Sequence, residues 1–172
     1  MTPNTPDTSD NPAAPGTLEP HQETALPDWV DYNGHMNVAY YLLIFDHATD
    51  ALWDRIGLGS RYRDRTDCST FGVECHMNWI AEALDGDRLR CTTQLLGCDE
   101  KRMHYFHHMY HEGDGHLVST IELMSLHVDL GTRKVCPMPD AVQSELAAIR
   151  AAHEELPVPG QVGHVMGVKP KG

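Results

Sequence analysis

The densest group of residues that could do chemistry is the run WVDYNGHMN, from Trp29 to Asn37. Asp31 could serve as a general base for a water molecule or as a nucleophile. Gly34 marks a tight loop directly before a helix start, where backbone N–H groups point outward with the positive end of the helix dipole behind them. Such donors stabilise the oxyanion of an acyl-transfer transition state, so this run predicts an acyl-transfer site.

The other residues of the run are assigned roles around that oxyanion. Backbone N–H donors are expected near four positions: Gly34, His35, Met36 and Val38. Asn33, His35 and Asn37 are expected to shape the loop and to bind the carbonyl oxygen or the water. A purely structural explanation stays open beside this one, because Asp, Asn and Gly are the common turn residues. Asp31 and Asn33 could only form Asx turns, and Asn37 could only cap the helix.

The elements that must position this run follow from the spacing of apolar residues. After Asn37, apolar side chains recur at helical intervals as far as Gly57. This predicts a long helix that is apolar over more than half of its circumference and covered on most sides. A loop containing Arg61, Arg63 and Arg65 is expected next. Alternation with a period of two then predicts antiparallel strands over 71–79, 88–96, 101–111 and 117–128, and helical spacing returns over 140–155. With a short N-terminal strand, the order predicts an α+β fold, an antiparallel sheet wrapped around one long central helix.

Length and charge limit the remaining possibilities. The 172 residues fit one domain, which we place at 18–156, between a proline-rich disordered leader at 1–17 and an irregular tail at 157–172. The net charge of -12 argues against a nucleic-acid partner. No apolar run is long enough to span a membrane, and no secretory or transit signal is present. Five cysteines without CxxC spacing indicate neither a disulfide framework nor a zinc ribbon, so reduced thiols in the cytoplasm are expected.

Three segments carry a resemblance to a known family: DYNGHMNVAYYLLIFDHATD, VECHMNWIAEALDGDRLR and DEKRMHYFHHMYHEGDGHLVSTIELMSLHVD. Over about residues 24–140 the chain resembles the hot-dog-fold acyl-CoA thioesterases of the 4-hydroxybenzoyl-CoA thioesterase type. The resemblance implies a homodimer or dimer of dimers, active sites at the subunit interface, no metal or other cofactor, and hydrolysis of a coenzyme A thioester. In one branch of the family an aspartate in the loop before the helix is the catalytic carboxylate, and Asp31 stands at that position. Another branch uses an acid on the helix, where Asp46 is nearest.

More narrowly, the chain resembles the betainyl-CoA thioesterases of carnitine breakdown, whose acyl group carries a quaternary ammonium. Trp29 and Trp79 could contribute to an aromatic cage for that cation, or they could simply fill the core and the interface. Glu74 and Asn78 of a partner subunit could position the attacking water, or they could be solvated surface residues. We therefore expect substrate contacts from Gly34, Met36, Trp29, Glu74, Asn78 and Trp79.

Two competing functions and one competing site remain. A hot-dog dehydratase pairs an Asp with a His in a different motif, which DYNGHMN does not resemble. A non-catalytic hot-dog protein that binds an acyl-CoA or an acylated partner is a second alternative, against which the acid at position 31 argues weakly. Four clustered histidines suggest a metal, namely His104, His107, His108 and His111. On a strand these alternate between opposite faces and cannot converge, so no metal site is expected there. The coenzyme A phosphates need basic residues, and no individual one is assigned.

Overall fold

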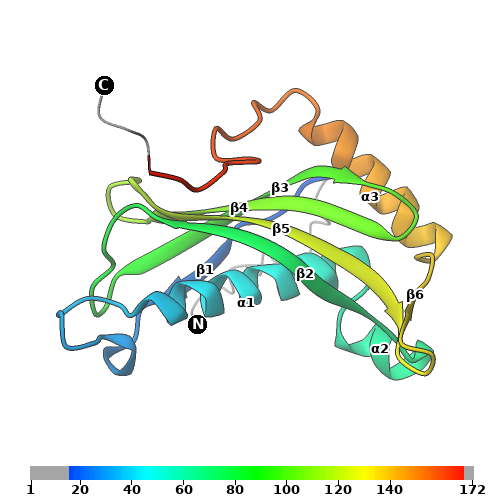
Figure 1. Ribbon diagram of the computed structural model, residues 1–172, viewed down its shortest axis with the longest axis horizontal. Helices are drawn as coiled ribbons and strands as arrows, with labels where there is room; N and C mark the ends of the chain where they lie inside the picture. The colour runs from blue at the N-terminus through cyan, green and yellow to red at the C-terminus, as the bar shows by residue number, and fades with distance from the viewer. Residues whose placement is uncertain (1–15, 169–172) are drawn as a thin grey trace, which may run out of the picture.

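The computed structural model describes residues 16–168 (Figure 1). The elements in chain order are β1 (His21–Thr24), the short 3-10 helix η1 (Pro27–Trp29), α1 (Val38–Ile56), α2 (Ser60–Thr66), β2 (Cys68–Trp79), β3 (Arg88–Cys98), β4 (Arg102–His111), β5 (Leu117–Asp129), β6 (Lys134–Val135) and α3 (Asp140–His153). The strands form one antiparallel sheet in the order β1-β3-β4-β5-β2, and β6 pairs with β5. The predicted α+β fold is confirmed. Most of the predicted leader, residues 1–15, lies outside the described residues, and 157–168 contain neither helix nor strand.

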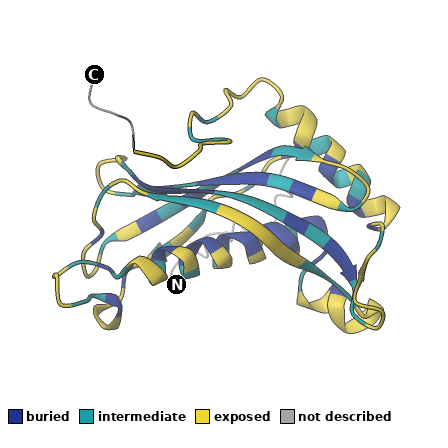
Figure 2. Ribbon diagram, viewed as in Figure 1, coloured by how far each residue is buried: buried dark blue, intermediate teal, exposed yellow. Residues whose placement is uncertain are grey.

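Helix α1 lies along one face of the curled sheet (Figure 1). Its N-terminus is capped by the Asn37 side chain, and it ends at Gly57, whose φ of 81° is left-handed. The buried face of α1 includes Tyr41 and Phe45, which pack with Ile121 of β5 in the core. One stripe of α1 stays exposed (Figure 2), and it includes Leu42, Asp46, Asp50 and Asp54. The other residues of α1 are mostly buried or half-buried, so the expectation that α1 is covered on most sides is confirmed.

A second core cluster joins the C-terminal half of α1 to α3. Leu52 and Trp53 of α1 share this cluster with Leu146 and Ile149 of α3 and with Tyr105 of β4. An ion pair of 2.9 Å between Arg55 and Glu145 lies beside it. Helix α3 thus fixes the end of α1 that lies away from the predicted site.

His107 of β4 is a fully buried polar side chain that faces α1. Its Nε2 lies 3.0 Å from the Thr49 hydroxyl and its Nδ1 lies 2.9 Å from the Thr93 hydroxyl, so a neutral ring satisfies both nitrogens. Burial lowers the pKa of His107 to about 3, followed by smaller contributions from two other histidines. His104, three residues earlier, lies on the other face, 2.7 Å from Glu122. The alternation expected for these histidines is present.

Two elements differ from the prediction. Residues 60–66 form the helix α2 where a loop was expected, because buried Tyr62 anchors about two turns of helix in the core. Strand β6 was missed, since two residues are too few to show a period. No helix within residues 16–168 has the length and apolar character needed to cross a bilayer.

The segment after α3 lies over the sheet face that α1 does not cover (Figure 1). The backbone N–H of Gly163 donates to Glu122 Oε2 at 2.8 Å, and the Gln94 amide donates to the Pro157 carbonyl oxygen at 3.4 Å. The rings of His76 and His164 lie 5.4 Å apart. The two faces of the sheet are therefore covered by α1 on one side and by this segment on the other.

Candidate active site

The loop that carries Asp31 is closed at its base and anchored in the core. Val30 and Met36 form an antiparallel bridge, and Met36 is fully buried. Inside the loop, the Asp31 N–H donates to the His35 carbonyl oxygen at 3.1 Å, and the Gly34 N–H donates to the Asp31 carbonyl oxygen at 3.0 Å. Gly34 has a φ of 83°, a left-handed backbone conformation that residues other than glycine rarely adopt. The sequence DYNG therefore builds a tight, fixed turn directly before α1.

Both oxygens of the Asp31 carboxylate accept hydrogen bonds. Oδ1 accepts from the Asn33 backbone N–H at 2.8 Å, and Oδ2 accepts from the Asn37 side-chain amide at 3.2 Å. The Asn37 carbonyl oxygen Oδ1 accepts from the Ala39 N–H at 3.0 Å and so caps α1. The structure thus brings together three predicted residues, and it shows the Asx turn and the helix cap as well. The half-buried carboxylate keeps lone pairs for a water or a substrate.

Two of the four expected backbone donors are already used within the chain. The Gly34 N–H bonds to Asp31, and the Met36 N–H donates to the Ala83 carbonyl oxygen at 2.7 Å. The prediction that these two N–H groups are free is therefore wrong. The Gly34 N–H closes the turn of its own loop, and the Met36 N–H bonds to Ala83, in a segment distant in sequence. Within residues 16–168, the N–H groups of His35 and Val38 have no protein acceptor. They are the donors left for an oxyanion at the positive end of the α1 dipole.

The His35 side chain is turned along the loop. Its Nδ1 lies 3.3 Å from the Met36 carbonyl oxygen, and its Nε2 lies 3.9 Å from a carboxylate oxygen of Glu82. The ring is therefore bound by the loop and by the segment after β2, and it makes no hydrogen bond to Asp31. This arrangement suits a residue that shapes the loop.

A cavity of about 310 Å³ lies between α1 and the strands β2, β4 and β5. Two carboxylates of α1 line it, Asp46 and Asp50, together with the rings of Phe45, Trp53 and Tyr105. Burial, followed by the charges of Asp46 and Asp54, raises the pKa of Asp50. Arg63 also lines the cavity, so the charged side chains of the cavity carry a formal net charge of -1, two carboxylates against one guanidinium, which favours a cation.

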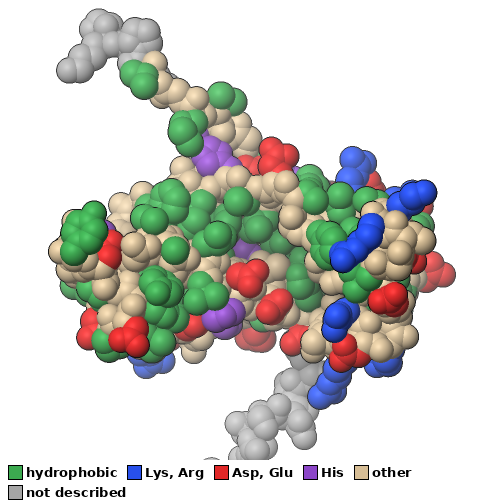
Figure 3. All heavy atoms as spheres, turned by 60° about the horizontal axis from the view of Figure 1, so that its bottom comes forward, with side chains coloured by type: hydrophobic (Ala, Val, Ile, Leu, Met, Phe, Trp, Pro, Cys, Tyr) green, Lys and Arg blue, Asp and Glu red, His purple; other side chains and the backbone are tan. Residues whose placement is uncertain are grey.

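Charge is distributed unevenly over the face that carries α1 (Figure 3). Hydrophobic side chains gather towards the end where α1 begins and most Lys and Arg lie over the end where α2 lies, whereas acidic side chains are spread over the face, its middle included. Three exposed arginines of α2 contribute to that basic end, Arg61, Arg63 and Arg65, and Arg63 also lines the cavity.

Comparisons with known proteins decide the family. The model of the thioesterase-like superfamily matches residues 25–146. The chain belongs to this superfamily. It is 44% identical to the betainyl-CoA thioesterase of Pseudomonas aeruginosa over 153 residues, which cover 89% of this chain and 96% of that protein. A Rhizobium meliloti protein named L-carnitine dehydrogenase/betainyl-CoA thioesterase is 39% identical over 82% of this chain, which spans 28% of its length. A Staphylococcus aureus structure in complex with CoA matches with a TM-score of 0.85 and 27% identity, covering 92% of this chain and 100% of that one.

The thioesterase has the predicted hot-dog fold and is an acyl-CoA thioester hydrolase. Its Trp29 is buried and stacks on Tyr40 with ring centroids 5.1 Å apart. One face of Trp29 is therefore filled, and this tryptophan supports the loop as a core residue. Trp79, at the end of β2, is 52% exposed and stays available to a partner or ligand.

Glu74 and Asn78 of the thioesterase lie on the sheet face away from α1. Glu74 lines a cavity of about 400 Å³ with His104 and Glu122, partly covered by the segment around Gly163. The Asn78 amide donates to the Thr120 hydroxyl at 3.4 Å. The structure does not bring either residue to the Asp31 loop of the same chain.

Sequence reasoning named Asp46 as a candidate on the helix but did not assemble the rest of the α1 cavity. Asp46 and Asp50 are four residues apart and share one helical stripe, which is the signal that points to their common face. The partner strands of that cavity come from residues 69–72 and 123–125, and only the fold brings these segments beside α1.

Proposed function

We propose that this thioesterase hydrolyses betainyl-CoA to betaine and CoA in carnitine catabolism in the cytoplasm. The identity to the Pseudomonas aeruginosa enzyme and to the dehydrogenase-linked proteins supports the substrate. The observation that carries the chemistry is the Asp31 carboxylate, held by two donors directly before the start of α1.

Asp31 acts at the thioester carbonyl carbon. It either takes a proton from a water that attacks this carbon, or attacks the carbon itself to give an anhydride that water then opens. In both routes the carbonyl oxygen becomes negative and receives hydrogen bonds from the free N–H groups of His35 and Val38. The C–S bond breaks, and the electron pair leaves on the CoA sulfur as a thiolate. Asn33 and Asn37 keep the carboxylate in place.

The active unit is a homodimer, either alone or as part of a dimer of dimers. Strand β2 is an edge strand that pairs only with β5, and it exposes Phe71 and Val73. Val38 and Leu42 of α1 are exposed apolar side chains as well. A second copy that pairs with β2 covers these side chains and completes the sheet.

The two-fold axis of such a pair brings the acyl pocket together from two chains. Val73 lies near the middle of β2, so antiparallel pairing there also makes the two α1 helices antiparallel. The Asp31 loop of one copy then faces the middle and later part of the other α1, where Asp46 and Asp50 line the cavity. These carboxylates and the ring of Trp53 would receive the quaternary ammonium.

Thiol release from a panel of acyl-CoAs tests the proposal. Betainyl-CoA is compared with its neutral isostere, in which carbon replaces the ammonium nitrogen, for wild type, Asp31→Asn and Asp50→Asn. We expect Asp31→Asn to lose turnover on both substrates, while Asp50→Asn raises KM about fivefold for betainyl-CoA alone, which corresponds to ~1 kcal/mol. Asp28→Asn is the control, since Asp28 is an exposed acid just before the loop.

The outcomes separate the parts of the proposal. Undiminished thiol release by Asp31→Asn overturns the mechanism. A preference for the neutral isostere overturns the betaine assignment and leaves the hydrolase. Binding of CoA thioesters without release by the wild type would favour the non-catalytic acyl-CoA-binding function.

A further inference from the structure

Three side chains with metal-binding atoms meet at the end of the sheet beside α2. Cys68 begins β2, His127 lies near the end of β5, and Cys136 directly follows β6. The strand register explains the meeting. His127 is paired with Thr70, so Cys68 is its diagonal neighbour on the same face. On the other side, the Cys136 N–H donates to the His127 carbonyl oxygen at 3.0 Å.

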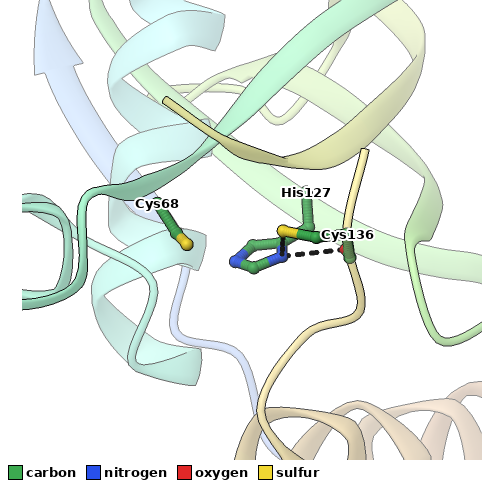
Figure 4. A group of neighbouring side chains, drawn as sticks. All are labelled: Cys68, His127 and Cys136. Atoms are coloured by element: carbon green, nitrogen blue, oxygen red, sulfur yellow. Dashed lines mark hydrogen bonds between the residues drawn. The ribbon is translucent and has the colours of Figure 1, made fainter. Parts of the chain in front are cut away.

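The three ligand atoms are close and partly enclosed. They lie within 4.8 Å of one another, and Cys136 Sγ is 3.3 Å from His127 Nδ1. Figure 4 shows the imidazole between the two sulfur atoms. The histidine is buried, whereas both cysteines are half-buried, so an ion could enter from solvent. Neither cysteine has a place in the proposed hydrolysis.

Two thiolates and one imidazole are donors that zinc prefers, at about 2.3 Å for sulfur and about 2.0 Å for nitrogen. Two such ligands on one tetrahedral ion lie roughly 3.3–3.8 Å apart, so the present spacing needs only small side-chain movements. The Tyr62 hydroxyl of α2 lies 2.9 Å from His127 Nε2. Because the Cys136 carbonyl oxygen, 3.0 Å from Nδ1, can only accept, Nδ1 carries the proton without a metal and Nε2 accepts from the Tyr62 hydroxyl. Transfer of that proton to Nε2, with the Tyr62 hydroxyl turned to accept it, would free Nδ1 for a metal.

We propose that Cys68, Cys136 and His127 Nδ1 bind one zinc ion, with the fourth position open to water. The ion would release the two thiol protons and break the Nδ1–H hydrogen bond to the Cys136 carbonyl oxygen, now 3.0 Å long, and the imidazole would keep its one proton on Nε2. It would tie the start of β2 to the hairpin β5–β6 beneath α2. The site is separate from the Asp31 loop, and CxxC spacing is not needed because neighbouring strands supply the ligands.

Two competing explanations shape the experiment. The cluster His21, Glu23 and His47 could also take a metal, through nitrogen and oxygen alone. Cobalt(II) distinguishes the two, because only a cysteine site gives thiolate-to-metal charge-transfer absorption. The second explanation is a Cys68–Cys136 disulfide formed by an oxidant, which a mass two protons lower would reveal.

The test uses the full chain, reduced with a phosphine and titrated with cobalt(II) and zinc(II). We expect charge-transfer absorption that saturates at one cobalt per chain and is displaced by zinc. Cys68→Ser and Cys136→Ser should lose it, whereas Cys98→Ser, at an exposed cysteine, and His47→Ala should keep it. Tyr62→Phe should weaken metal affinity roughly 10–100-fold.

Three results would overturn the zinc site. One is the absence of charge-transfer absorption in the reduced wild type, which needs no variant and so cannot reflect misfolding. Another is absorption that persists in both Cys68→Ser and Cys136→Ser. The third is zinc raising the thermal midpoint of Cys136→Ser as much as that of the wild type, since a ligand stabilises only a state that binds it.

Discussion

Asn37 does two jobs with the two atoms of one side-chain amide. Its oxygen caps α1 through Ala39, and its nitrogen donates to Asp31. The structural and the catalytic explanations of this motif are therefore compatible, because the cap itself orients the group that holds the carboxylate. Ser or Thr would cap the helix as well but would not reach Asp31 with an N–H.

Substitutions at Asn37 should separate these two jobs. Asn37→Asp keeps the cap and thus the stability, but it replaces a donor to Asp31 with a second negative charge. We expect kcat to fall and the acidic limb of its pH profile to move to higher pH. Asn37→Ala removes the donor without adding a charge, so it should lower kcat, move the limb in the same direction but less, and cost about 1 kcal/mol in urea unfolding through the lost cap. An unchanged pH profile for Asn37→Asp would contradict the positioning role.

The lowered pKa of His107 predicts how the free energy of unfolding depends on pH. Its folded pKa of about 3 lies below its ordinary value of 6.5, so the unfolded chain binds more protons between these values. The contribution of neutral His107 to the free energy of unfolding is fully present above pH 6.5. It falls by about 1.4 kcal/mol per pH unit as the pH drops towards 3. Burial lowers the pKa of His108 and His153 and adds to the slope.

Urea unfolding at pH 5, 6 and 7 measures that slope. His107→Gln should flatten it, because the amide does not titrate in this range, although the variant starts from a lower stability. His164→Gln is the control, since His164 is exposed on the C-terminal segment. A slope in His107→Gln as steep as in the wild type would count against His107 as its source.

Local sequence was enough to predict elements with a clear period or a clear cap. The cap at Asn37 and the stop at Gly57 gave the bounds of α1, and alternation gave the four long strands. Helix α2 was missed because its seven residues are anchored by one buried ring, Tyr62, which no period reveals. The loop at Asp31 was predicted from its turn residues. The hydrogen bond from the Met36 N–H to Ala83 was not predicted, because it joins segments that are distant in sequence.

Helix α2 presents arginines where the proposed substrate needs positive charge. Arg63→Ala and Arg65→Ala should each raise KM for acyl-CoA about fivefold, a loss of ~1 kcal/mol for an exposed charge contact to a phosphate. We expect kcat to stay unchanged, because the contact is equal in the ground and transition states. A truncated acyl-pantetheine substrate without the nucleotide should show no change.

Steady-state kinetics with both substrates checks this assignment. Arg150→Ala serves as the control, since Arg150 is an exposed arginine on α3. An equal KM increase for the truncated substrate would mean that α2 affects the pocket by packing and not through phosphate.

Across the whole molecule, the net charge of -12 is divided between regions with different tasks. The first 54 residues contain no Lys or Arg and supply the loop and the acidic stripe of α1, and the basic residues follow from Arg55. On the face with α1, hydrophobic side chains gather towards one end and most Lys and Arg lie over the other (Figure 3). In the proposed two-fold pair these ends are reversed in the second copy, so the Asp31 end of each copy would face the cavity of the other that Asp46 and Asp50 line.

The dimer is tested best at Val73, which is 53% exposed at a β-bulge of the edge strand β2. Val73→Lys places a charge on the edge that pairing would bury, so sedimentation should change from dimer to monomer. Turnover should be lost with it, while circular dichroism stays that of a folded chain. Val158→Lys is the matched control, because Val158 is 68% exposed on the segment after α3. A monomeric Val73→Lys that keeps full turnover would show that one chain holds the whole site, and the cavity between α1 and β2 of the same copy would then have to take the acyl group.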